Sequence, residues 1–446
     1  MFRKYKCITK NDKKFLYIPL TNKLLEINPV VEKILSTQTY PELISKIENE
    51  KIDVQEFINN LHQLYLFEED EKEICNMSDI ELSGKLSCLI LSVAQECNLR
   101  CSYCFADGGE YANRGKMSYE TARQAIDLLQ RNSTEEVLYV IFFGGEPLLN
   151  FSLIQQTVHY CEQLQKTGEK RYLFSITTNG TLITEEIAKY LKEHNIHIHI
   201  SIDGDKKTND ANRYYSNKGG SYDEIIKGVH KIEDFGMTSA RGTLTNVETN
   251  INKTITHLLN IGFPTVYISP AYNMIDTKKI NEVIHSYDQL YDTFEHALKS
   301  QNYKKCRGIQ NIYKILKFIH SAQVRRGFCG AGINEIAVDI NGDLYPCHRF
   351  IGMQEFYMGN VADTDKELYD RMRSFFNKTS RPMEECKNCI ARGICGGGCL
   401  NENYLMCKNI KTALKESCDI MQYNVEKALN LYIGLSSKEK EALFAN

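Results

Sequence analysis

The sequence predicts an α/β protein whose centre is a partial (β/α)6 barrel, with a smaller unit before it and a cysteine-rich region after it. Six apolar runs alternate with helical segments between about residues 86 and 300, a pattern typical of a parallel sheet. Residues 1 to about 75 instead combine a few strand-like runs with three segments of helical periodicity. The chain has 16 cysteines, which cluster at 97–104 and at 386–399. Three domains of different character are therefore expected.

Composition and charge indicate a globular protein without a bias toward polyanions. The 446 residues are too many for one ordinary core, and a net charge of -3 gives no reason to expect a nucleic-acid partner. The N-terminus lacks the apolar region of a secretory signal, and nowhere do about 18 apolar residues run together as a membrane span requires. We therefore expect a cytoplasmic protein without a membrane partner, in which clustered cysteines bind metal rather than form disulfides.

Residues 1–78 are expected to form a winged-helix-like domain. The stretch "KKFLYIPLTNKLLEINPVV" alternates enough to suggest short strands around a turn. Apolar residues at helical spacing follow in "VVEKILS", "YPELISKIEN" and "VQEFINNLHQLYLF". The acidic run "FEEDEKEIC" after them is typical of a solvated linker.

Residues 79–305 are expected to form the barrel. The candidate strands share an apolar run that a loop and a helical segment follow: 87–94, 137–144, 172–179, 196–203, 238–245 and 265–271. Ser118 precedes one helical segment, and Ser221 with Glu224 forms a capping-box pattern before another. In such a sheet, ligands bind at the carboxyl ends of the strands.

Residues 306–446 are expected to be loops rich in cysteine and glycine, closed by one helix around 418–435. A segment of this kind has little apolar core of its own. Metal clusters would then supply the stability that a core normally provides.

Three cysteines occupy the loop directly after the first barrel strand. Cys97, Cys101 and Cys104 have the spacing C-x3-C-x2-C. Three thiolates can ligate three irons of a four-iron, four-sulfur cluster, which leaves the fourth iron open for a substrate. A zinc site that lacks one ligand is the alternative.

This spacing, with Tyr103 inside the last gap, resembles that of the radical S-adenosylmethionine (radical SAM) enzymes. The stretch "FFGGEPLL" after the second strand is similar to the GGEP motif of that family, whose backbone accepts hydrogen bonds from the methionine amino group. The resemblance implies one four-iron cluster and a SAM site, in which Ser201 contacts the ribose and Arg241 the carboxylate. The full set of implied SAM-binding residues is Tyr103, Phe105, Gly144, Gly145, Glu146, Pro147, Ser201 and Arg241.

The same resemblance implies a reaction type. One electron cleaves SAM to a 5'-deoxyadenosyl radical, which takes hydrogen from an unactivated carbon. An electron donor such as flavodoxin or ferredoxin would then be a partner. Without the resemblance, the Gly-Gly-Glu-Pro stretch is typical of a turn before a helix. Likewise, Arg241 is equally typical of an arginine that is paired on the surface of a sheet.

Seven further cysteines resemble those of the SPASM domain of peptide- and protein-modifying radical SAM enzymes. They are Cys329, Cys347, Cys386, Cys389, Cys395, Cys399 and Cys418. The resemblance implies two auxiliary iron–sulfur clusters, and thus three four-iron clusters in all. The second auxiliary cluster takes Cys386, Cys389, Cys395 and Cys418. The first takes Cys329, Cys347 and Cys399, so one iron is open to a substrate thiolate unless Cys306 or Cys407 supplies the fourth ligand. For the inner four cysteines, a zinc ribbon is the alternative.

The residue after Cys347 departs from one branch of the family. In the sulfatase-maturing branch an aspartate base stands there, whereas this chain has His348. Because histidine also accepts protons, His348 is a candidate base, although a structural role fits equally well. The stretches "CGAG", "YPCHRFIG" and "MGNV" together resemble thioether-forming maturases of cysteine-rich, ribosomally made peptides, of the sactipeptide, ranthipeptide or SCIFF type.

The unit at 1–78 resembles the PqqD-like recognition element of such maturases, to which a leader peptide adds as a strand. The expected edge for the leader of the precursor peptide is 14–26, although an inert packing domain would look much the same. Carbon–carbon cross-linking, peptide epimerisation and formylglycine formation in a sulfatase are alternative activities. A zinc-stabilised protein that binds peptides without altering them is an alternative of another class.

Overall fold

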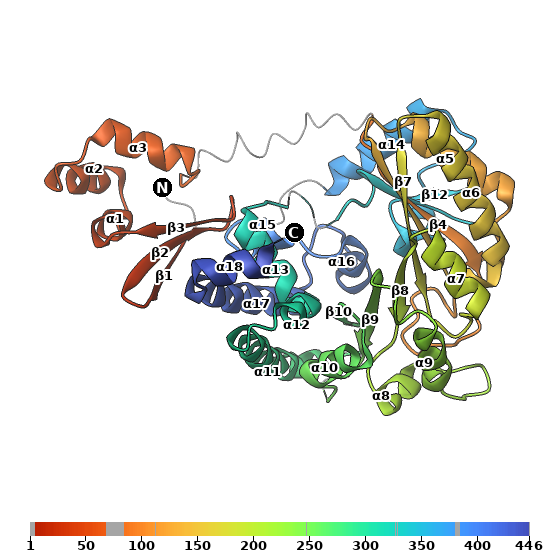
Figure 1. Cartoon of the computed structure of the whole chain (residues 1–446). Coiled ribbons are helices and arrows are strands. Elements are labelled where there is room, and N and C mark those ends of the chain that lie inside the picture. The colour runs from red at the N-terminus through yellow and green to blue at the C-terminus, as the bar shows by residue number, and fades with distance from the viewer. Residues whose placement is uncertain are drawn as a thin grey trace.

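A computed structural model of the chain describes residues 5–67, 84–111, 113–246, 248–325, 327, 329–379 and 384–445. The acidic run from Glu68 to Cys75 and the expected boundary after residue 78 lie outside these ranges. Figure 1 shows a small N-terminal module at one end, a curved sheet with outer helices at the other, and C-terminal helices between them.

The N-terminal module is an antiparallel sheet with three helices. Its elements are β1 (Lys6–Lys10), β2 (Lys13–Ile18), β3 (Lys23–Ile27), α1 (Pro29–Leu35), α2 (Tyr40–Asn49) and α3 (Val54–Gln63). Each helix begins after a residue whose side chain accepts a backbone N–H of the first turn, namely Asn28, Thr39 and Asp53. Buried side chains from both layers, including Leu16, Ile34 and Leu43, form a separate small core.

The order of the strands corrects the expected edge at 14–26. The sheet order is β1-β2-β3, so β2 is the central strand and has a neighbour on each side. On the outer side of β1, the Lys6 ammonium lies 2.5 Å from the Glu426 carboxylate and Lys10 donates to the Asn430 carbonyl at 2.6 Å. Of the expected segment, only β3 is an outer strand, and it lies on the side of the sheet away from Glu426.

The turn between β2 and β3 fixes the module to the C-terminal region. The Asn22 side chain is completely buried, and its amide nitrogen donates to the carbonyls of Phe318 at 2.7 Å and Gln323 at 2.8 Å. Its amide oxygen accepts the Tyr17 hydroxyl at 3.0 Å. Asn22 has a φ of 50°, a left-handed conformation that asparagine tolerates better than most residues.

Six parallel strands form the expected partial barrel, which confirms the fold class. In chain order they are β4 (Cys88–Gln95), β6 (Val137–Gly144), β7 (Arg171–Thr178), β8 (His197–Ser201), β9 (Thr238–Leu244) and β10 (Val266–Pro270). Along β6, Leu138, Val140 and Phe142 are fully buried in the main core, whereas Tyr139 between them is 47% exposed. One face of the sheet therefore packs against helices, and the other lines an accessible barrel lumen.

Helices on the outside of the sheet link these strands (Figure 1). They are α5 (Tyr119–Arg131), α6 (Phe151–Thr167), α7 (Glu185–Glu193), α8 (Lys206–Asn212), α9 (Tyr222–His230) and α10 (Ile251–Ile261). Ser118 caps α5 as expected, because its hydroxyl accepts the Thr121 N–H at 3.0 Å. The short strand β5 (Gly115–Lys116) pairs with the end of β4.

The expected capping box at Ser221 and Glu224 is wrong. Ser221 does precede α9, but its hydroxyl turns inward and donates to the Arg213 carbonyl at 2.8 Å. The first N–H of the helix, that of Tyr222, donates instead to the Asp210 carboxylate at 2.8 Å. A residue twelve positions away therefore replaces the local cap, which a local sequence pattern does not reveal.

The C-terminal region is more helical than expected. After α11 (Ile280–Lys299), which follows β10 within the range expected for the barrel, its helices are α12 (Tyr303–Gly308), α13 (Gln310–Ser321), α14 (Asp365–Thr379), α15 (Arg392–Cys395), α16 (Leu400–Cys407), α17 (Lys415–Gly434) and α18 (Ser437–Phe444). The last helix is thus α18 rather than the one expected at 418–435. Buried residues such as Leu316 and Leu429 belong to the same core cluster as the barrel, so this region shares an apolar core. Residue 305, the expected boundary, lies within α12.

A strand of the C-terminal region also extends the barrel sheet. β11 (Glu335–Val338) pairs in parallel with β4, with Glu335 opposite Cys88, and β12 (Leu344–Tyr345) pairs with β11 antiparallel. Short 3-10 helices occur at Pro147–Asn150, Thr277–Lys279, His348–Phe350, Gln354–Phe356 and Glu384–Cys386. In the described parts of the chain, no helix is long and apolar enough to cross a membrane.

Candidate active site

The loop after β4 brings the first three cysteines together. The segment 212–215 holds this loop in place: the Tyr214 carbonyl accepts the Arg100 N–H at 2.7 Å, and the Asn212 carbonyl accepts that of Ser102 at 2.9 Å. Burial raises the pKa of Cys97 to about 12, and the neighbouring charges of Glu146 and Cys101 contribute. Burial also raises the pKa of Cys101, with a smaller contribution from Cys104. Each thiol of the motif therefore lies near the next.

Two glycines at the end of β6 allow the β6 backbone to lie directly against the chain that leads into this loop. Gly144 has a φ of 137°, and a Cβ on it would lie 2.2 Å from the Ala94 carbonyl oxygen. A Cβ on Gly145 would lie 2.4 Å from the Glu96 carbonyl oxygen. Only glycine fits at both positions, because a side chain would push β6 away from the chain that enters the cysteine loop.

Glu146 ties the ends of two barrel strands together. Its buried carboxylate accepts the Thr178 hydroxyl at 2.7 Å, the Asn179 N–H at 2.7 Å and the Leu148 N–H at 3.0 Å. Burial raises the pKa of this carboxyl, although the three hydrogen bonds oppose the rise. Within the described residues, no donor reaches the Gly145 carbonyl, so that oxygen can accept a hydrogen bond from a ligand.

Tyr103 belongs to a buried network that the sequence did not reveal. Its hydroxyl lies 2.8 Å from the Asp203 carboxylate and accepts the Arg213 guanidinium at 2.5 Å. Asp203 also accepts the Thr243 N–H at 2.9 Å. The Nε of Arg213 is buried and has no partner among the described residues. Arg213 lowers the pKa of Cys101, so its cation lies beside the cysteine loop.

Ser201 and Arg241, both expected to contact SAM, stand opposite each other on β8 and β9. Arg241 lies on the lumen face, where burial and then the Arg241 charge lower the pKa of His199 to about 3 and that of Lys314 to about 8. The Lys314 ammonium lies 5.0 Å from the centre of the Tyr267 ring. In the described ranges, no carboxylate pairs with Arg241 or Lys314, so this part of the lumen is positively charged.

Phe105 and His348 meet at the lumen. Their ring centres are 5.8 Å apart, and the His348 ring lies 4.2 Å from that of Phe143. The Nδ1 of His348 is buried and without a partner among the described residues. Burial lowers the pKa of His348 to about 3, with contributions from Arg349 and Arg241. His348 is therefore neutral near neutral pH and has a free ring nitrogen.

The expected first auxiliary set of cysteines comes together in the structure. Burial raises the pKa of Cys329 to about 11, with smaller contributions from the charges of Glu335 and Cys399. Burial likewise raises the pKa of Cys347, with contributions from Cys399 and Cys329. The Arg349 guanidinium donates to the Cys399 sulfur at 3.5 Å, which places a cation beside this set.

The expected second auxiliary set is also assembled. Burial raises the pKa of Cys418 to about 12, and the neighbouring thiols of Cys395, Cys386 and Cys389 contribute in that order. These four residues come from η7 (Glu384–Cys386), the turn after it, α15 and α17. Seven cysteines far apart in the sequence thus form two separate groups.

Neither candidate for the missing ligand lies with the first set. Cys306 is completely buried, and its thiol donates to the Phe294 carbonyl at 3.8 Å. Burial raises the pKa of Cys407, and the charges that act on it come from Glu416 and Glu385, next to the second set. The structure therefore does not support either cysteine as the fourth ligand.

The donor chemistry fits the expected iron–sulfur clusters. Each of the three groups offers thiols that are for the most part partly buried, and binding to iron would replace the proton on each of them. Arg213 and Arg349 supply cations next to the first group and the first auxiliary set. Among the described residues, no three His, Cys, Asp or Glu side chains lie close enough together to hold a single metal ion.

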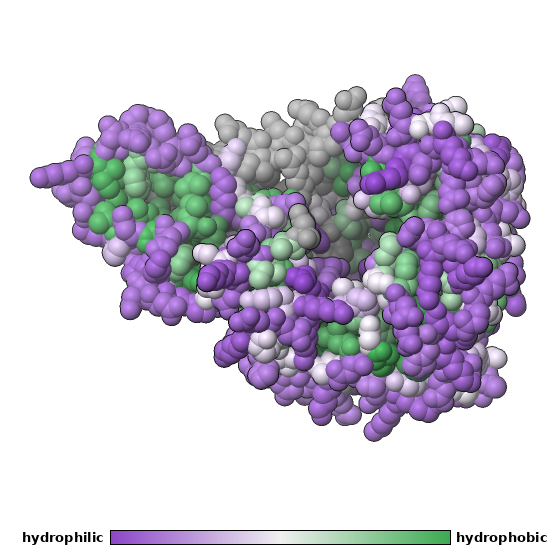
Figure 2. Space-filling view, viewed as in Figure 1, coloured by the Kyte–Doolittle hydropathy of each residue, from purple (hydrophilic) through white to green (hydrophobic). Residues whose placement is uncertain are grey.

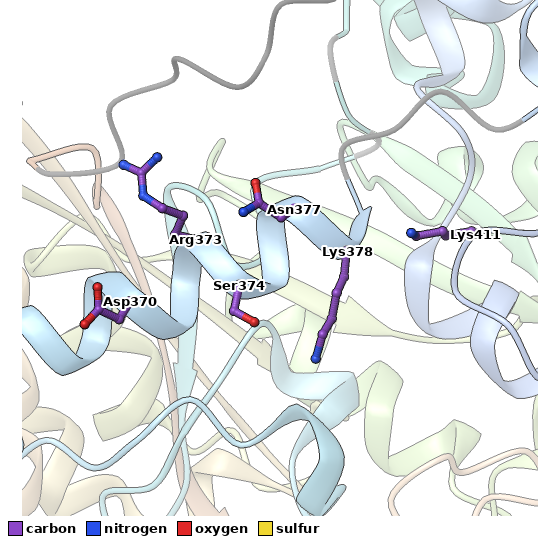
Figure 3. A pocket seen from close by; sticks show the side chains of 6 residues that line it. All are labelled: Asp370, Arg373, Ser374, Asn377, Lys378 and Lys411. Carbon is purple, nitrogen blue, oxygen red and sulfur yellow. The ribbon is translucent and has the colours of Figure 1, made fainter.

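A cavity of about 530 Å³ lies along α14 (Figure 3). Its lining residues are Asp370, Arg373, Ser374, Asn377, Lys378 and Lys411. None of these residues is a predicted site residue, and no cysteine is among them.

Two sequence families match the first cysteine group and four cysteines of the auxiliary sets, Cys329, Cys347, Cys386 and Cys389. The Radical SAM superfamily matches residues 91–252, and the SPASM family, described as an iron–sulfur cluster-binding domain, matches residues 329–390. The chain has a radical SAM domain and a SPASM domain. The two domains support SAM binding and iron–sulfur clusters as the chemistry of the protein.

Three characterised relatives are similar to this radical SAM/SPASM chain. The radical SAM cyclopropyl synthase TigE of Paramaledivibacter caminithermalis is 26% identical over 95% of this chain and 94% of its own. A cysteine-type anaerobic sulfatase-maturating enzyme of Clostridium novyi is 25% identical over 76% and 96%. The subtilosin biosynthesis protein AlbA of Bacillus subtilis is 25% identical over 71% and 69%. The chain is a radical SAM enzyme related to peptide maturases and sulfatase maturases.

Two solved structures show the same fold. The enzyme anSMEcpe with bound AdoMet superposes with a TM-score of 0.66 at 22% identity, over 80% of this chain and 98% of that one. SuiB of Streptococcus suis bound to its precursor peptide SuiA superposes with a TM-score of 0.51 at 17% identity, over 92% and 98%. These similarities confirm the arrangement of a radical SAM barrel with a SPASM region.

Proposed function

We propose that the protein forms thioether links in a ribosomally made, cysteine-rich precursor peptide. The observation that carries this proposal is the difference between the two auxiliary sets. Cys386, Cys389, Cys395 and Cys418 offer four thiols, whereas Cys329, Cys347 and Cys399 offer three. A cluster held by three thiolates has one iron that can take a cysteine of the substrate.

The SAM site is proposed at the carboxyl ends of the barrel strands. Cys97, Cys101 and Cys104 would hold the first cluster. The Gly145 carbonyl would accept the SAM amino group, and Ser201 would contact the ribose. When bound, SAM and the reduced cluster supply the 5'-deoxyadenosyl radical.

We assign the SAM carboxylate to Arg213 in place of Arg241. Arg213 lies beside Cys101 and has an Nε without a partner among the described residues. Arg241 lies on the lumen face, near His199 and Lys314. A carboxylate beside the open iron would therefore meet the guanidinium of Arg213 first.

The substrate is proposed to enter the lumen. SAM bound at the cluster of Cys97, Cys101 and Cys104 would supply the abstraction of one hydrogen from a carbon of the acceptor residue, and Cys329, Cys347 and Cys399 would hold the cluster at which the substrate cysteine sulfur is placed to bond to that carbon. His348 stays the candidate base of the site, because its Nδ1 has no partner among the described residues, but burial lowers its pKa to about 3 and makes it a weak base. The surplus electron leaves through the first auxiliary site, and flavodoxin or ferredoxin supplies the electron that cleaves SAM.

The N-terminal module is proposed to bind the leader of the precursor peptide at β3. Its partly exposed apolar residues include Leu25 and Ile27 on β3 and Val54 and Phe57 on α3. Figure 2 shows hydrophobic side chains on the face of this module. An extended peptide can add to an outer strand through main-chain hydrogen bonds while its apolar side chains cover such residues. We keep residues 1–78 as the extent of this recognition domain.

The test is incubation of the anaerobically reconstituted full chain with SAM, dithionite and cysteine-rich peptides encoded nearby. We expect 5'-deoxyadenosine and a peptide that has lost two hydrogens per link, with one cysteine per link resistant to alkylation. Cys101→Ala should abolish deoxyadenosine formation and lower the iron content by one cluster.

The other activities give other products. Carbon–carbon cross-linking removes two hydrogens but leaves every cysteine open to alkylation, and epimerisation leaves the mass unchanged. Zinc in place of iron, with intact SAM, would instead indicate a peptide-binding protein.

Sulfatase maturation is the second candidate. The similarity to the Clostridium novyi enzyme and to the anSMEcpe fold favours it. In that case a sulfatase-derived peptide, rather than a cysteine-rich precursor, would be converted, and its cysteine would lose sulfur to become formylglycine.

A further inference from the structure

A closed loop places a carboxylate next to two cysteines of the first auxiliary set. The N–H of Glu335 donates to the Gly330 carbonyl at 3.0 Å, and the Gly332 N–H donates to the Glu335 carbonyl at 2.8 Å. These hydrogen bonds hold Glu335 close to Gly330, the residue that follows Cys329. The Gly332 N–H also reaches the Pro346 carbonyl at 3.1 Å, directly before Cys347.

The Glu335 side chain lies on the face of β11 that carries this set. Side chains two positions apart on a strand share a face, so Glu335 points to the same side as Ala337. Ala337 packs in one apolar cluster with Cys347. In agreement, the Glu335 charge contributes, after burial, to the raised pKa values of Cys329 and Cys347.

Among the described residues, no cation forms an ion pair with Glu335. Its one partner in the described parts of the chain is the Cys88 thiol, 3.8 Å from its carboxylate oxygen. A partly buried carboxylate without a cation or strong donors among the described residues is costly, and a bound metal removes that cost.

We propose that the Glu335 carboxylate is the fourth ligand of the first auxiliary cluster in the resting enzyme. It would occupy the iron that Cys329, Cys347 and Cys399 leave open, so the inference rests on the cluster assignment made under Proposed function. Iron in such clusters prefers sulfur to oxygen donors, so a peptide cysteine can replace the carboxylate. In that exchange an iron–oxygen bond breaks, an iron–sulfur bond forms, the thiol proton passes to solvent, and no electron is transferred.

The experiment uses the full chain with Cys97, Cys101 and Cys104 replaced by alanine, so that only the auxiliary clusters remain. Iron content, Mössbauer spectra and EPR spectra of the reduced protein are compared with and without Glu335→Gln and Glu335→Cys. We expect E335Q to change the spectrum of one cluster and leave the other unchanged. A small thiol should shift the same spectrum in the parent but not in E335C, where a fourth thiolate already fills the iron.

Asp343→Asn is the matched control, because Asp343 lies on the same hairpin and its carboxylate accepts the Asn360 amide at 2.8 Å instead of facing the cysteines. Its spectra should equal those of the parent. Unchanged spectra in both E335Q and E335C, at full iron content, would overturn the proposal.

Two further outcomes separate the inference from the proposed function. If the parent binds only one auxiliary cluster, the cluster assignment itself fails, and the ligand proposal fails with it. If E335Q does not load iron, E335C decides: a changed spectrum supports the ligand role, and an unchanged one excludes it.

Discussion

Arg213 is a buried cation whose polar contacts lie beside the cysteine loop. Its Nη1 donates to Tyr103, and Tyr103 in turn contacts Asp203. The guanidinium can therefore hold the cysteine loop in place and still present its free Nε to a ligand. A lysine keeps the charge but cannot make both contacts at once.

We expect Arg213→Lys to weaken SAM binding by about tenfold or more, since a charge-assisted hydrogen bond contributes about 1.5–3 kcal/mol. Equilibrium dialysis of SAM with the reconstituted enzyme measures this. Arg123→Lys on α5, where Arg123 pairs only with surface carboxylates, is the control and should bind SAM normally. Equal affinity in R213K and the parent would exclude Arg213 as the carboxylate contact.

At the scale of the elements, helix α9 depends on a distant residue for its start. Asp210 accepts the Tyr222 N–H, whereas Glu224 makes only an exposed ion pair with Lys227. Loss of a capping side chain costs about 1 kcal/mol, and an exposed pair contributes a few tenths at most.

Asp210→Ala should therefore raise the hydrogen-exchange rate of the first turn of α9 by about fivefold. Glu224→Ala should leave that rate nearly unchanged. Mass spectrometry of a peptide that covers residues 221–226 distinguishes the two variants. The reverse ranking would restore the capping box that the sequence predicts.

The outer strand β3 is the element on which leader recognition depends. Ile27→Lys should weaken binding of a labelled leader peptide by about tenfold, because burial of an isoleucine side chain contributes roughly 1.5–3 kcal/mol. Ile44→Lys, on α2 and also half-buried, is the matched control. Fluorescence anisotropy measures both affinities. Equal losses in the two variants would indicate general damage to the module rather than a site at β3.

At the scale of the whole molecule, the buried side chain of Asn22 connects the N-terminal module to the C-terminal region. Asn22 donates to two carbonyls near the end of α13 and accepts the Tyr17 hydroxyl. The ion pair between Lys6 and Glu426 at the other contact is exposed and contributes little. The position of the module relative to the active site therefore depends on Asn22, on the backbone contact of Pro19 with Gly393, and on Ile8 and Tyr17, which are buried in the same core cluster as the C-terminal helices.

We expect Asn22→Ala to leave two carbonyls without donors, at a cost of about 1–3 kcal/mol each. The module should then separate more readily, and limited proteolysis should cleave between it and the barrel faster. Asn60→Ala, at an exposed position of α3, should not change the cleavage rate. Equal rates for N22A and the parent would show that other contacts hold the module.

Local sequence patterns were sufficient to predict the barrel strands and the loop that carries the first three cysteines. The apolar run at 137–144 forms β6 with the same bounds, because a strand buried on one face needs little beyond its own residues. The three cysteines of 97–104 lie within one loop, so their proximity follows from chain connectivity. The need for glycine at 144 and 145 is instead tertiary, since a Cβ there would meet the carbonyl oxygens of Ala94 and Glu96, about 50 residues away.

By itself, the amino-acid sequence determined the α/β barrel, the positions of the thiols along the chain and the resemblance that assigns their chemistry. Only the tertiary structure decided that β3 is the outer strand, that Asp210 starts α9, and that Arg213 and Glu335 lie beside the cysteine groups. The physical reason is that each of these features depends on a hydrogen bond or strand pairing between segments distant in the sequence. Residue type and spacing along the chain carry no information about such contacts.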